Sequence, residues 1–303
     1  MRRGTVEIPC YILTIDSEGG ARRLNATRQL RELGLQEIFV AGYLKSDPGI
    51  RAEYNHWMNL LRSKRSLTEG EIAVYCGHRK VWREFLSSGH SHALVLEDDF
   101  CVTDAGRMKE AIRDALNHAH VWDILKFFDF RPKRVIECRQ LDGTTVVRYK
   151  YAASGAVAYL ISRKAARQLL RRKRFFRAVD DDFSWPWELD LTVWSVSPNL
   201  VTEISHELGG SLLEQERQTR RERRNVLRSL WGNVIQAYKL IRSFIYNLGS
   251  KGRTTGGKRT GTVPDQQGTH RTAAVDTSGW RVSGSRSGDV ESATHSSFPE
   301  TVS

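Results

Sequence analysis

The sequence predicts an α/β fold in which helices cover the faces of a mixed sheet. Short apolar runs alternate with stretches of helical period from the start of the chain to about residue 210. One of these runs, residues 93–96, is wholly apolar, as strands buried in a parallel sheet are. Asp142 and Gly143 stand between two strand-like runs and mark a hairpin, so antiparallel strands are also expected.

The first half of the chain is expected to alternate strand and helix. Gly34 ends the first helix, because glycine readily adopts the left-handed conformation found at helix ends. Asp104 is placed to cap a later helix. The expected strands are residues 8–15, 37–41 and 93–96, and the expected helices are residues 22–33, 69–86 and 105–119.

The second half begins with the antiparallel part of the sheet. A strand is expected at residues 121–128, and the hairpin pairs residues 134–138 with residues 144–149. Another strand follows at residues 156–161. Ser162 then caps a very basic helix that runs to about residue 174.

Composition divides the 303 residues into three segments. Hydrophobic residues make up 40% of the chain, which is enough to bury a core over most of its length and excludes a wholly disordered protein. We expect a folded domain at residues 1–213, a basic amphipathic helical segment at residues 214–248 and a disordered tail at residues 249–303. The tail is rich in Ser, Thr and Gly and lacks periodicity.

The segment at residues 214–248 joins a run of arginines to apolar residues at helical spacing. It could lie on an anionic bilayer and insert its apolar stripe. It could equally pack that stripe on the folded domain and leave the arginines in solvent. The arginines are Arg217, Arg220, Arg221, Arg223, Arg224 and Arg228, and the stripe is Leu227, Leu230, Trp231, Val234, Ile235, Tyr238, Ile241, Ile245 and Leu248.

The charge of the chain predicts an anionic partner. There are 47 Lys and Arg against 35 Asp and Glu, a net charge of +12, which suits nucleic acid, a nucleotide-linked substrate or an acidic membrane surface. No apolar run reaches the ~18 residues of a spanning helix, and the first residues are too polar for a signal peptide. The four cysteines form no CxxC pair and are expected to be reduced thiols. A cytoplasmic protein is expected, which could lie peripherally on the inner face of the plasma membrane.

Three consecutive carboxylates, Glu97, Asp98 and Asp99, directly follow the apolar run. Ligands of open α/β sheets bind beyond the carboxyl ends of strands, and clustered acids repel one another unless a cation lies between them. Hard oxygen ligands suit Mg²⁺ or Mn²⁺, which could bridge the diphosphate of a nucleotide. The alternative is an acidic helix N-terminus, which is common.

A second acidic cluster spans residues 180–182, followed by Trp185, Trp187 and Glu188. Indole faces stack on sugar rings, and carboxylates accept hydrogen bonds from sugar hydroxyls. One of these acids could also deprotonate an acceptor hydroxyl. The alternative is an exposed loop with two aromatic residues packed beneath it. His78, by itself, is more simply a structural histidine of its helix.

Several motifs together resemble glycosyltransferase family 25, which includes lipooligosaccharide galactosyltransferases and collagen galactosyltransferases. Some residues depart from the family pattern: Thr14 replaces an Asn, Gly77 a Ser, and Val74 follows Ala73 where a Cys is usual. These departures leave open a catalytically inactive, glycosyltransferase-like binding protein. The matching motifs are residues 11–16 with Arg22, residues 67–72, 77–82, 93–99 and 154–166, the pair Val179 and Asp180, and residues 197–201.

The resemblance implies a GT-A-type nucleotide-sugar-binding sandwich and an inverting transfer, often from UDP-galactose, to a saccharide or lipid-linked saccharide in lipopolysaccharide or surface polysaccharide biosynthesis. It implies Mn²⁺ or Mg²⁺ as cofactor, with Glu97, Asp99 and His206 as ligands, although His206 could instead be a surface histidine. Asp180 or Glu188 would be the base. The implied donor-binding residues are Thr14, Asp16, Arg22, Glu71, His78, Asp98 and Gly155.

A nucleic-acid-binding protein is the remaining alternative, because residues 163–177 are strongly basic. The acidic clusters would repel phosphate, and no known binding motif is recognised. No nucleic acid partner is therefore expected.

Overall fold

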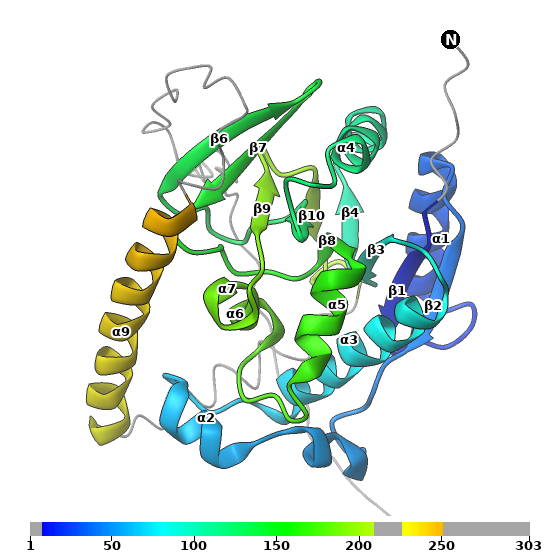
Figure 1. Cartoon of the computed structure of the whole chain (residues 1–303). Coiled ribbons are helices and arrows are strands. Elements are labelled where there is room, and N and C mark those ends of the chain that lie inside the picture. The colour runs from blue at the N-terminus through cyan, green and yellow to red at the C-terminus, as the bar shows by residue number, and fades with distance from the viewer. Residues whose placement is uncertain (1–7, 209–225, 251–303) are drawn as a thin grey trace, which may run out of the picture. The chain divides into compact units, whose positions relative to one another are not determined.

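The computed structural model describes residues 8–208 and 226–250 of the chain (Figure 1). Within them, the main sheet has eight strands in the order β2-β1-β3-β8-β5-β9-β7-β6, and a small second sheet pairs β10 with β4. The strands are β1 Cys10–Thr14, β2 Glu37–Ala41, β3 His92–Glu97, β4 Phe100–Val102, β5 Ile124–Lys126, β6 Val135–Leu141, β7 Thr144–Tyr149, β8 Ala158–Ser162, β9 Val193–Val196 and β10 Val201–Glu203.

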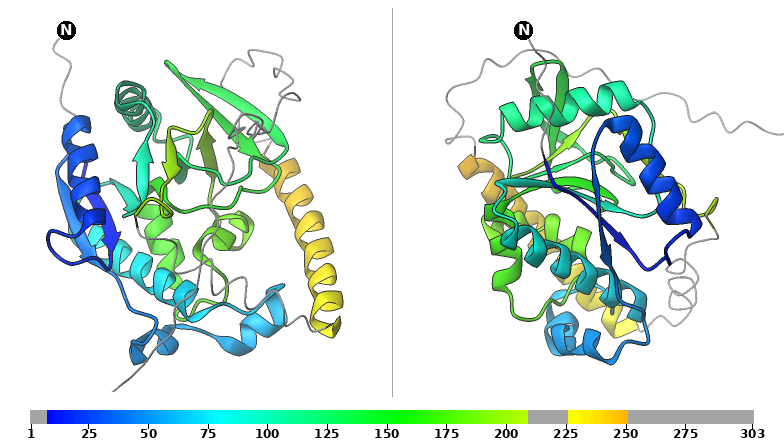
Figure 2. Two further views of the ribbon diagram at one scale, coloured as in Figure 1. Left: turned by 180° about the vertical axis from the view of Figure 1, so that it is seen from behind. Right: turned by 90° about the vertical axis from the view of Figure 1, so that its right-hand side faces the viewer.

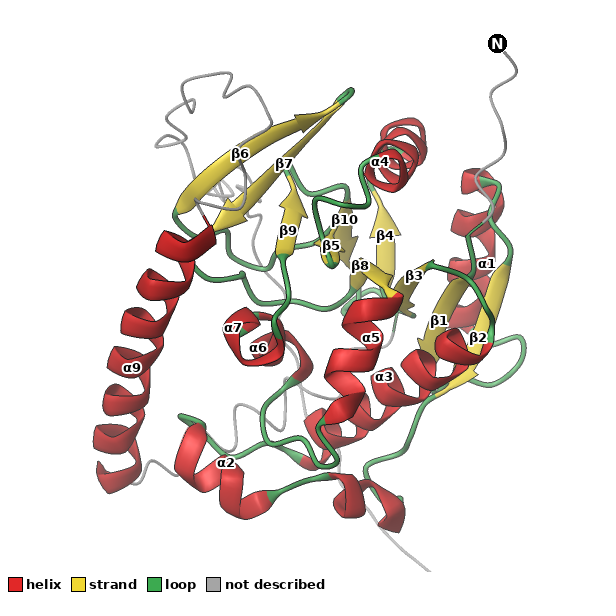
Figure 3. Cartoon of the chain, in the orientation of Figure 1, coloured by secondary structure: helices red, strands yellow, loops and turns green. Residues whose placement is uncertain are grey.

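The sheet is mixed, as predicted (Figure 3). Strand β1 is parallel to both β2 and β3, and β5 is parallel to β9. Strand β8 is antiparallel to its two neighbours, β3 and β5, and the β6–β7 hairpin extends the sheet from β9. The carboxyl ends of β1, β3, β5 and β9 therefore share one edge with the start of β8. Loops at that edge are where ligands of open α/β sheets bind.

Helices cover both faces of the sheet (Figure 2). The core on one face packs α1 (Ala21–Leu33) and α4 (Ala105–Asn117) on one set of strand side chains. The other face carries α3 (Glu69–Ser87), α5 (Arg163–Arg171), α6 (Val179–Phe183) and α7 (Pro186–Leu189). Neighbouring residues of one strand enter opposite cores, as Val95 and Leu96 of β3 do, because strand side chains alternate.

The helix boundaries follow the signals read from the sequence. Gly34 ends α1 with a φ of 71°, and the side chain of Asp104 caps α4 by accepting a hydrogen bond from Arg107 N. Ser162 caps α5 through Ala165 N. Helix α3 begins with a capping box between Thr68 and Glu71, in which each side chain bonds the other residue's backbone N–H. These caps fix where each helix begins or ends relative to the sheet.

Several short elements were not predicted. They include the 3₁₀ helix η1 (Pro48–Glu53), the helix α2 (His56–Arg62), the helices α6 and α7, and the strands β4, β9 and β10. The strand expected at residues 121–128 is limited to β5, and the basic helix ends at Arg171. Elements this short span about one turn or a few residues, so hydrophobic periodicity cannot identify them.

The amphipathic segment forms one long helix, α9 (Val226–Ser250), in the same compact unit as the sheet, Met1–Gly261. One side of α9 contacts the domain: Trp231 Nε1 donates to Leu61 O (3.0 Å) and Tyr246 OH to Leu191 O (2.6 Å). No helix in the described ranges is long and apolar enough to cross a membrane. The arginines at 217–224 and nearly all of the predicted tail, including the second unit Thr262–Ser303, lie outside the described residues.

Candidate active site

The acidic motif lies at the shared edge of the sheet, at the end of β3. Asp98 is only 6% exposed, and both of its carboxylate oxygens are bonded within the protein. Its Oδ2 accepts from Thr14 Oγ1 at the end of β1 (2.5 Å), and its Oδ1 accepts from the Arg22 guanidinium of α1 (2.7 Å). Asp98 therefore joins two strands and a helix at the point where the donor was predicted to bind.

Asp16 completes this network. Its backbone N–H donates to Thr14 Oγ1 (2.9 Å), and its carboxylate accepts from Arg22 N (3.0 Å). Four of the predicted donor-binding residues (Thr14, Asp16, Arg22 and Asp98) are thus brought together. Because Thr14 and Asp98 are buried and already bonded, they shape the loop, whereas Arg22 keeps part of its side chain exposed.

Asp99 has the least satisfied carboxylate of the motif. Its Oδ1 is buried without a hydrogen-bond partner among the described residues, and the Arg22 guanidinium lies 3.7 Å from its Oδ2. Burial, together with the negative charges of Glu97, Glu203 and Asp98, raises the pKa of Asp99 to about 8. The folded chain therefore concentrates more negative charge here than its own cations balance.

His78 positions the third acid, Glu97. The imidazole is fully buried, with Nδ1 2.9 Å from Tyr159 OH and Nε2 3.2 Å from Glu97 Oε1. Trp82 Nε1 donates to the same Tyr159 hydroxyl (3.0 Å), which leaves the Tyr159 proton to be donated to Nδ1. The imidazole proton then sits on Nε2 and faces Glu97. The chain Trp82, Tyr159, His78, Glu97 fixes that carboxylate at the sheet edge.

The departure from the family pattern at Gly77 has a local physical reason. A Cβ atom built on Gly77 would lie 2.6 Å from Leu13 Cδ1, so the Leu13 side chain of β1 occupies the space of a residue-77 side chain. The missing hydroxyl is replaced by closer packing of α3 on β1.

Gly155 and Asp180 meet at the same edge. Gly155 N donates to Asp180 Oδ2 (3.1 Å), and Gly155 has a φ of 109°, a conformation that favours glycine. Lys126 holds the loop before β8 in place. Its buried ammonium donates hydrogen bonds to Asp129 Oδ1 (2.6 Å) and to Ala153 O in that loop (2.7 Å). Lys126 and Asp129 were not predicted as part of the site, although a lysine inside an apolar strand is a signal that the sequence offers.

Glu188, the other candidate base, is held by arginines. Its carboxylate bonds Arg177 (2.7 and 3.1 Å), Arg172 (3.0 Å) and Arg62 (3.0 Å). Burial acts to raise the pKa of Glu188, but its bond to Arg177 and the charges of all three arginines prevail and lower it. A carboxylate so paired is a poor proton acceptor, which leaves Asp180 as the candidate base.

Glu71 serves the start of α3. Besides its role in the capping box, its carboxylate makes two 2.6 Å bonds to the Arg65 guanidinium, and its side chain is 2% exposed. Glu71 therefore has a structural role at the start of α3.

The two tryptophans do not form the exposed sugar-stacking surface expected from the sequence. Trp185 is 4% exposed, because the Arg177 guanidinium lies 3.8 Å from its ring centroid on one side and Tyr238 of α9 packs nearby. Trp187 packs toward Tyr246, also on α9. Side chains of α9 thus pack beside both rings, and Trp187 stays half-buried. A sequence read locally cannot show which distant helix packs on a loop.

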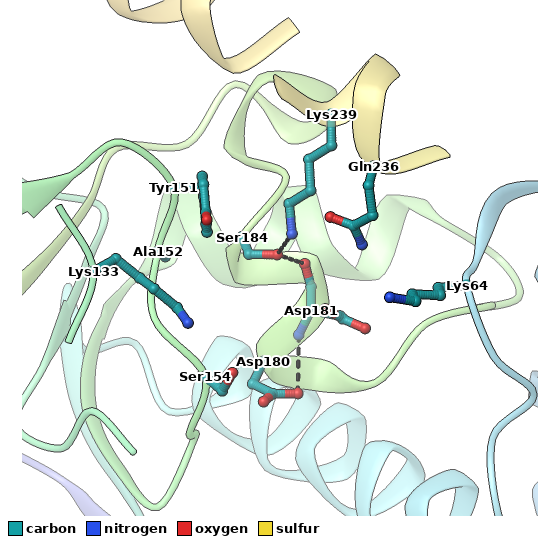
Figure 4. A pocket seen from close by; sticks show the side chains of 10 residues that line it. All are labelled: Lys64, Lys133, Tyr151, Ala152, Ser154, Asp180, Asp181, Ser184, Gln236 and Lys239. Carbon is teal, nitrogen blue, oxygen red and sulfur yellow. Dashed lines mark hydrogen bonds between the residues drawn. The ribbon is translucent and has the colours of Figure 1, made fainter. Parts of the chain in front are cut away.

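A pocket of about 330 Å³ opens beside Asp180 (Figure 4). Asp180, Asp181 and Ser184 form one wall, and the segment before β8, including Tyr151 and Ser154, forms another. Two residues of α9 close it. Asp180, which accepts from Gly155 N at the sheet edge, is part of the pocket lining, whereas Thr14 and Arg22 are not.

The model of the family described as Glycosyltransferase family 25 (LPS biosynthesis protein) matches residues 8–185, more than half of the chain. The chain belongs to glycosyltransferase family 25. The resemblance read from the motifs is confirmed, and the mixed α/β sandwich is the fold expected of it.

The curated relatives in family 25 differ in what their names say of activity. The chain is 26% identical over 166 residues to a rat protein named probable inactive glycosyltransferase 25 family member 3, covering 48% of this chain and 28% of the relative. The human inactive member 3 is 27% identical over 166 residues, covering 48% and 27%. Zebrafish procollagen galactosyltransferase 1 is 28% identical over 173 residues, covering 54% and 24%. The chain thus spans less than a third of the length of these relatives.

The acidic motif of this family 25 chain supplies some, but not all, of the ligands that a divalent ion needs. The unpartnered, crowded carboxylate of Asp99 suits a hard cation such as Mn²⁺ or Mg²⁺. Over residues 8–208 and 226–250, no three His, Cys, Asp or Glu side chains gather into a group that could hold a metal ion. His206 is exposed after β10, although Ile204 N donates to Asp99 O (2.9 Å) and brings that turn beside the motif. Glu97 and Asp99 fit as ligands to which a bound nucleotide would add further oxygens.

Proposed function

We propose that the chain is an active, inverting glycosyltransferase that moves a sugar, galactose from UDP-galactose, onto a saccharide of lipopolysaccharide or surface polysaccharide. The observation that carries the proposal is the Asp99 carboxylate, which is buried, crowded by other acids and lacks a hydrogen-bond partner for Oδ1 within the described structure. Such an arrangement costs stability in the folded chain, and a bound cation would offset that cost.

In this proposal the donor site is built by the Thr14, Asp98 and Arg22 network. Glu97 and Asp99 would hold Mn²⁺ or Mg²⁺, and His78 would keep Glu97 in place through its Nε2 proton. When bound, the ion would neutralise negative charge on the departing nucleoside diphosphate. The partly exposed Arg22 guanidinium would face the same charge.

Asp180 would act on the acceptor. Its bond to Gly155 N fixes the carboxylate at the sheet edge, and it lines the pocket in which an acceptor could be held. It would accept the proton of the attacking hydroxyl while that hydroxyl bonds to the anomeric carbon and the diphosphate leaves. Direct displacement of this kind inverts the configuration at that carbon.

A catalytically inactive binding protein is the second candidate, favoured by the names of the rat and human relatives. Hydrolysis of UDP-galactose in the presence and absence of Mn²⁺ separates the two. We expect Mn²⁺-dependent release of galactose, which Asp99→Asn should reduce by at least about 100-fold, a typical effect of losing electrostatic stabilisation of a leaving group. Absence of hydrolysis for all common nucleotide sugars, with nucleotide binding retained, would favour the binding protein.

We also propose that α9 rests on an anionic bilayer at the cytoplasmic face, where a lipid-linked acceptor would be reached. The outward side of α9 is apolar and exposed, with six side chains more than half exposed. Arg217 to Arg224 immediately precede this helix in the chain and would contribute roughly 1 kcal/mol each on anionic lipid. The exposed residues are Leu230, Val234, Ile241, Phe244, Ile245 and Leu248.

A further inference from the structure

The pocket beside Asp180 brings together lysines from three separate parts of the chain. Lys64 comes from the segment between α2 and α3, Lys133 from the segment before β6, and Lys239 from α9. Figure 4 shows the three side chains extending into the pocket that Asp180 and Asp181 line, with Lys239 reaching Ser184. Lysines separated this widely in sequence are not a by-product of one charged helix face.

Lys239 is the fixed member of the set. It is 8% exposed, its ammonium donates to Ser184 Oγ, and it lies 5.5 Å from the Tyr151 ring centroid and 5.4 Å from that of Trp185. Burial lowers the pKa of Lys239, opposed by the negative charge of Asp181. A lysine is rarely placed in such surroundings unless its charge is used.

The other two lysines are free to bind. Neither Lys64 nor Lys133 has a hydrogen bond or ion pair to any residue that the structure describes, and Lys64 is exposed. With three lysines against Asp180 and Asp181, the pocket walls carry a surplus positive charge. The two carboxylates and the hydroxyls of Ser154 and Tyr151 add groups that can bond sugar hydroxyls.

We propose that this pocket is the acceptor site and that the acceptor is a saccharide carrying an anionic group, a phosphate or a uronic carboxylate. The lysines bind the anionic group, and a hydroxyl of the same saccharide reaches Asp180. The inference rests on the proposed transferase function, and it adds the acceptor class that the family alone leaves open. It also gives α9 a second role, because this helix supplies Lys239 from its inner side while its outer side faces the membrane.

Calorimetric titration of the full chain with glucose 6-phosphate, glucuronate and glucose tests the proposal without requiring turnover. We expect at least one of the two anionic sugars to bind roughly tenfold or more tightly than glucose, and the tighter of the two identifies the anionic group. Lys64→Met combined with Lys133→Met should abolish that preference, and raised salt should weaken it. Methionine keeps most of the apolar length of each side chain, so the exposed position 64 and the half-buried position 133 should both tolerate it.

Lys109→Met is the matched control, because Lys109 is exposed on α4, on the opposite face of the sheet. It should leave the anionic preference unchanged. Lys239→Met should also lower affinity for the anionic sugar, and if that variant is unstable the Lys64 and Lys133 variants still decide the matter. Titration with UDP reports the donor site separately, and its affinity should be the same in wild-type and lysine variants.

Equal affinity of wild type for glucose and both anionic sugars would overturn the proposal, as would a preference that survives loss of Lys64 and Lys133. An equal loss in Lys109→Met would also overturn it, since the effect would then be one of net charge. These results leave the transferase proposal standing if UDP-galactose is hydrolysed. Failure of hydrolysis with a lysine-dependent anionic preference would instead overturn the transferase and leave an anionic-sugar site.

Discussion

The surroundings of Asp99 disfavour its ordinary ionised state. Its Oδ1 lacks a partner in the described part of the chain, and Glu97, Asp98 and Glu203 all add negative charge around it. Arg22 offsets only part of this charge, since it is bonded mainly to Asp98. A group held in this way is typical of a ligand site rather than of a structural ion pair.

The crowding of Asp99 makes a pH-dependent prediction for the metal-free protein. Its folded pKa of about 8 lies above the ordinary 3.8, so the folded chain keeps a proton that the unfolded chain releases between these values. Below about pH 4 Asp99 is protonated in both states and does not lower the stability of the folded chain. As the pH rises from 4 toward 8, only the unfolded chain releases the proton, so the free energy of unfolding falls. Asp99→Asn should therefore raise the free energy of unfolding by on the order of 5 kcal/mol at pH 8, since a shift of about four pKa units is worth roughly 1.4 kcal/mol per unit, and by nearly nothing at pH 4.

Thermal unfolding in chelator at the two pH values measures this difference. Glu110→Gln, an exposed change on α4, should show no such pH dependence. Added Mn²⁺ should raise the melting temperature of wild type but not of Asp99→Asn. A variant less stable than wild type at pH 8 would show that the carboxylate is satisfied in solution.

The sequence predicted part of this site because its acids are contiguous and follow an apolar strand. It could not distinguish Asp180 from Glu188 as base, since the difference lies in partners elsewhere in the chain. Arg62, which helps to hold Glu188, is 126 residues away. The role of His78 was missed for the same reason, because Tyr159 and Glu97 join it only once α3 packs on the sheet.

At the level of elements, long helices and their caps were predictable, whereas one-turn elements were not. Caps depend on one or two residue types at fixed spacing, as at Gly34 and Asp104, so they can be read locally. The helical spacing of the apolar residues in α9 was also evident, but this spacing alone could not show which side of the helix faces the domain. The structure divides the predicted stripe, since Ile235 is 7% exposed and Ile241 is 60% exposed.

That division makes a prediction for α9. Ile241→Asp should leave the free energy of unfolding within about 0.5 kcal/mol, because the side chain is exposed. It should reduce sedimentation with anionic vesicles, because a charge would enter the apolar side that we propose inserts. Ile235→Asp is the matched change on the inner side and should cost about 3 kcal/mol or more through burial of an unpaired charge. Unchanged vesicle binding by folded Ile241→Asp would contradict the membrane proposal.

At the scale of the whole molecule, the main sheet domain and α9 depend on each other. The helix covers Trp185, bonds Ser184 through Lys239 and bonds Leu191 through Tyr246. These contacts lie behind Asp180 and its pocket, so α9 completes the wall of the proposed acceptor site. The segment that the sequence left undecided between membrane and domain therefore contacts the domain with one side, and its other, apolar side is the one that we propose faces a membrane.

Two shortened chains test this dependence. A chain ending at Ser250 keeps α9 and should melt at the temperature of the full chain, because residues from about 251 onward have the composition of a tail that buries little surface. A chain ending at Glu214 removes α9, which exposes Trp185 and leaves Ser184 and Leu191 without their helix partners. We expect it to melt about 10 °C or more below the full chain, since 1 kcal/mol shifts the melting temperature of a domain of this size by roughly 2 to 4 °C.

Calorimetry of the three chains at one pH provides the measurement. Equal melting of the shorter chain and the full chain would show that α9 is not held on the domain in solution, and a lower melting temperature for the chain ending at Ser250 would show that the C-terminal residues contribute to the folded unit.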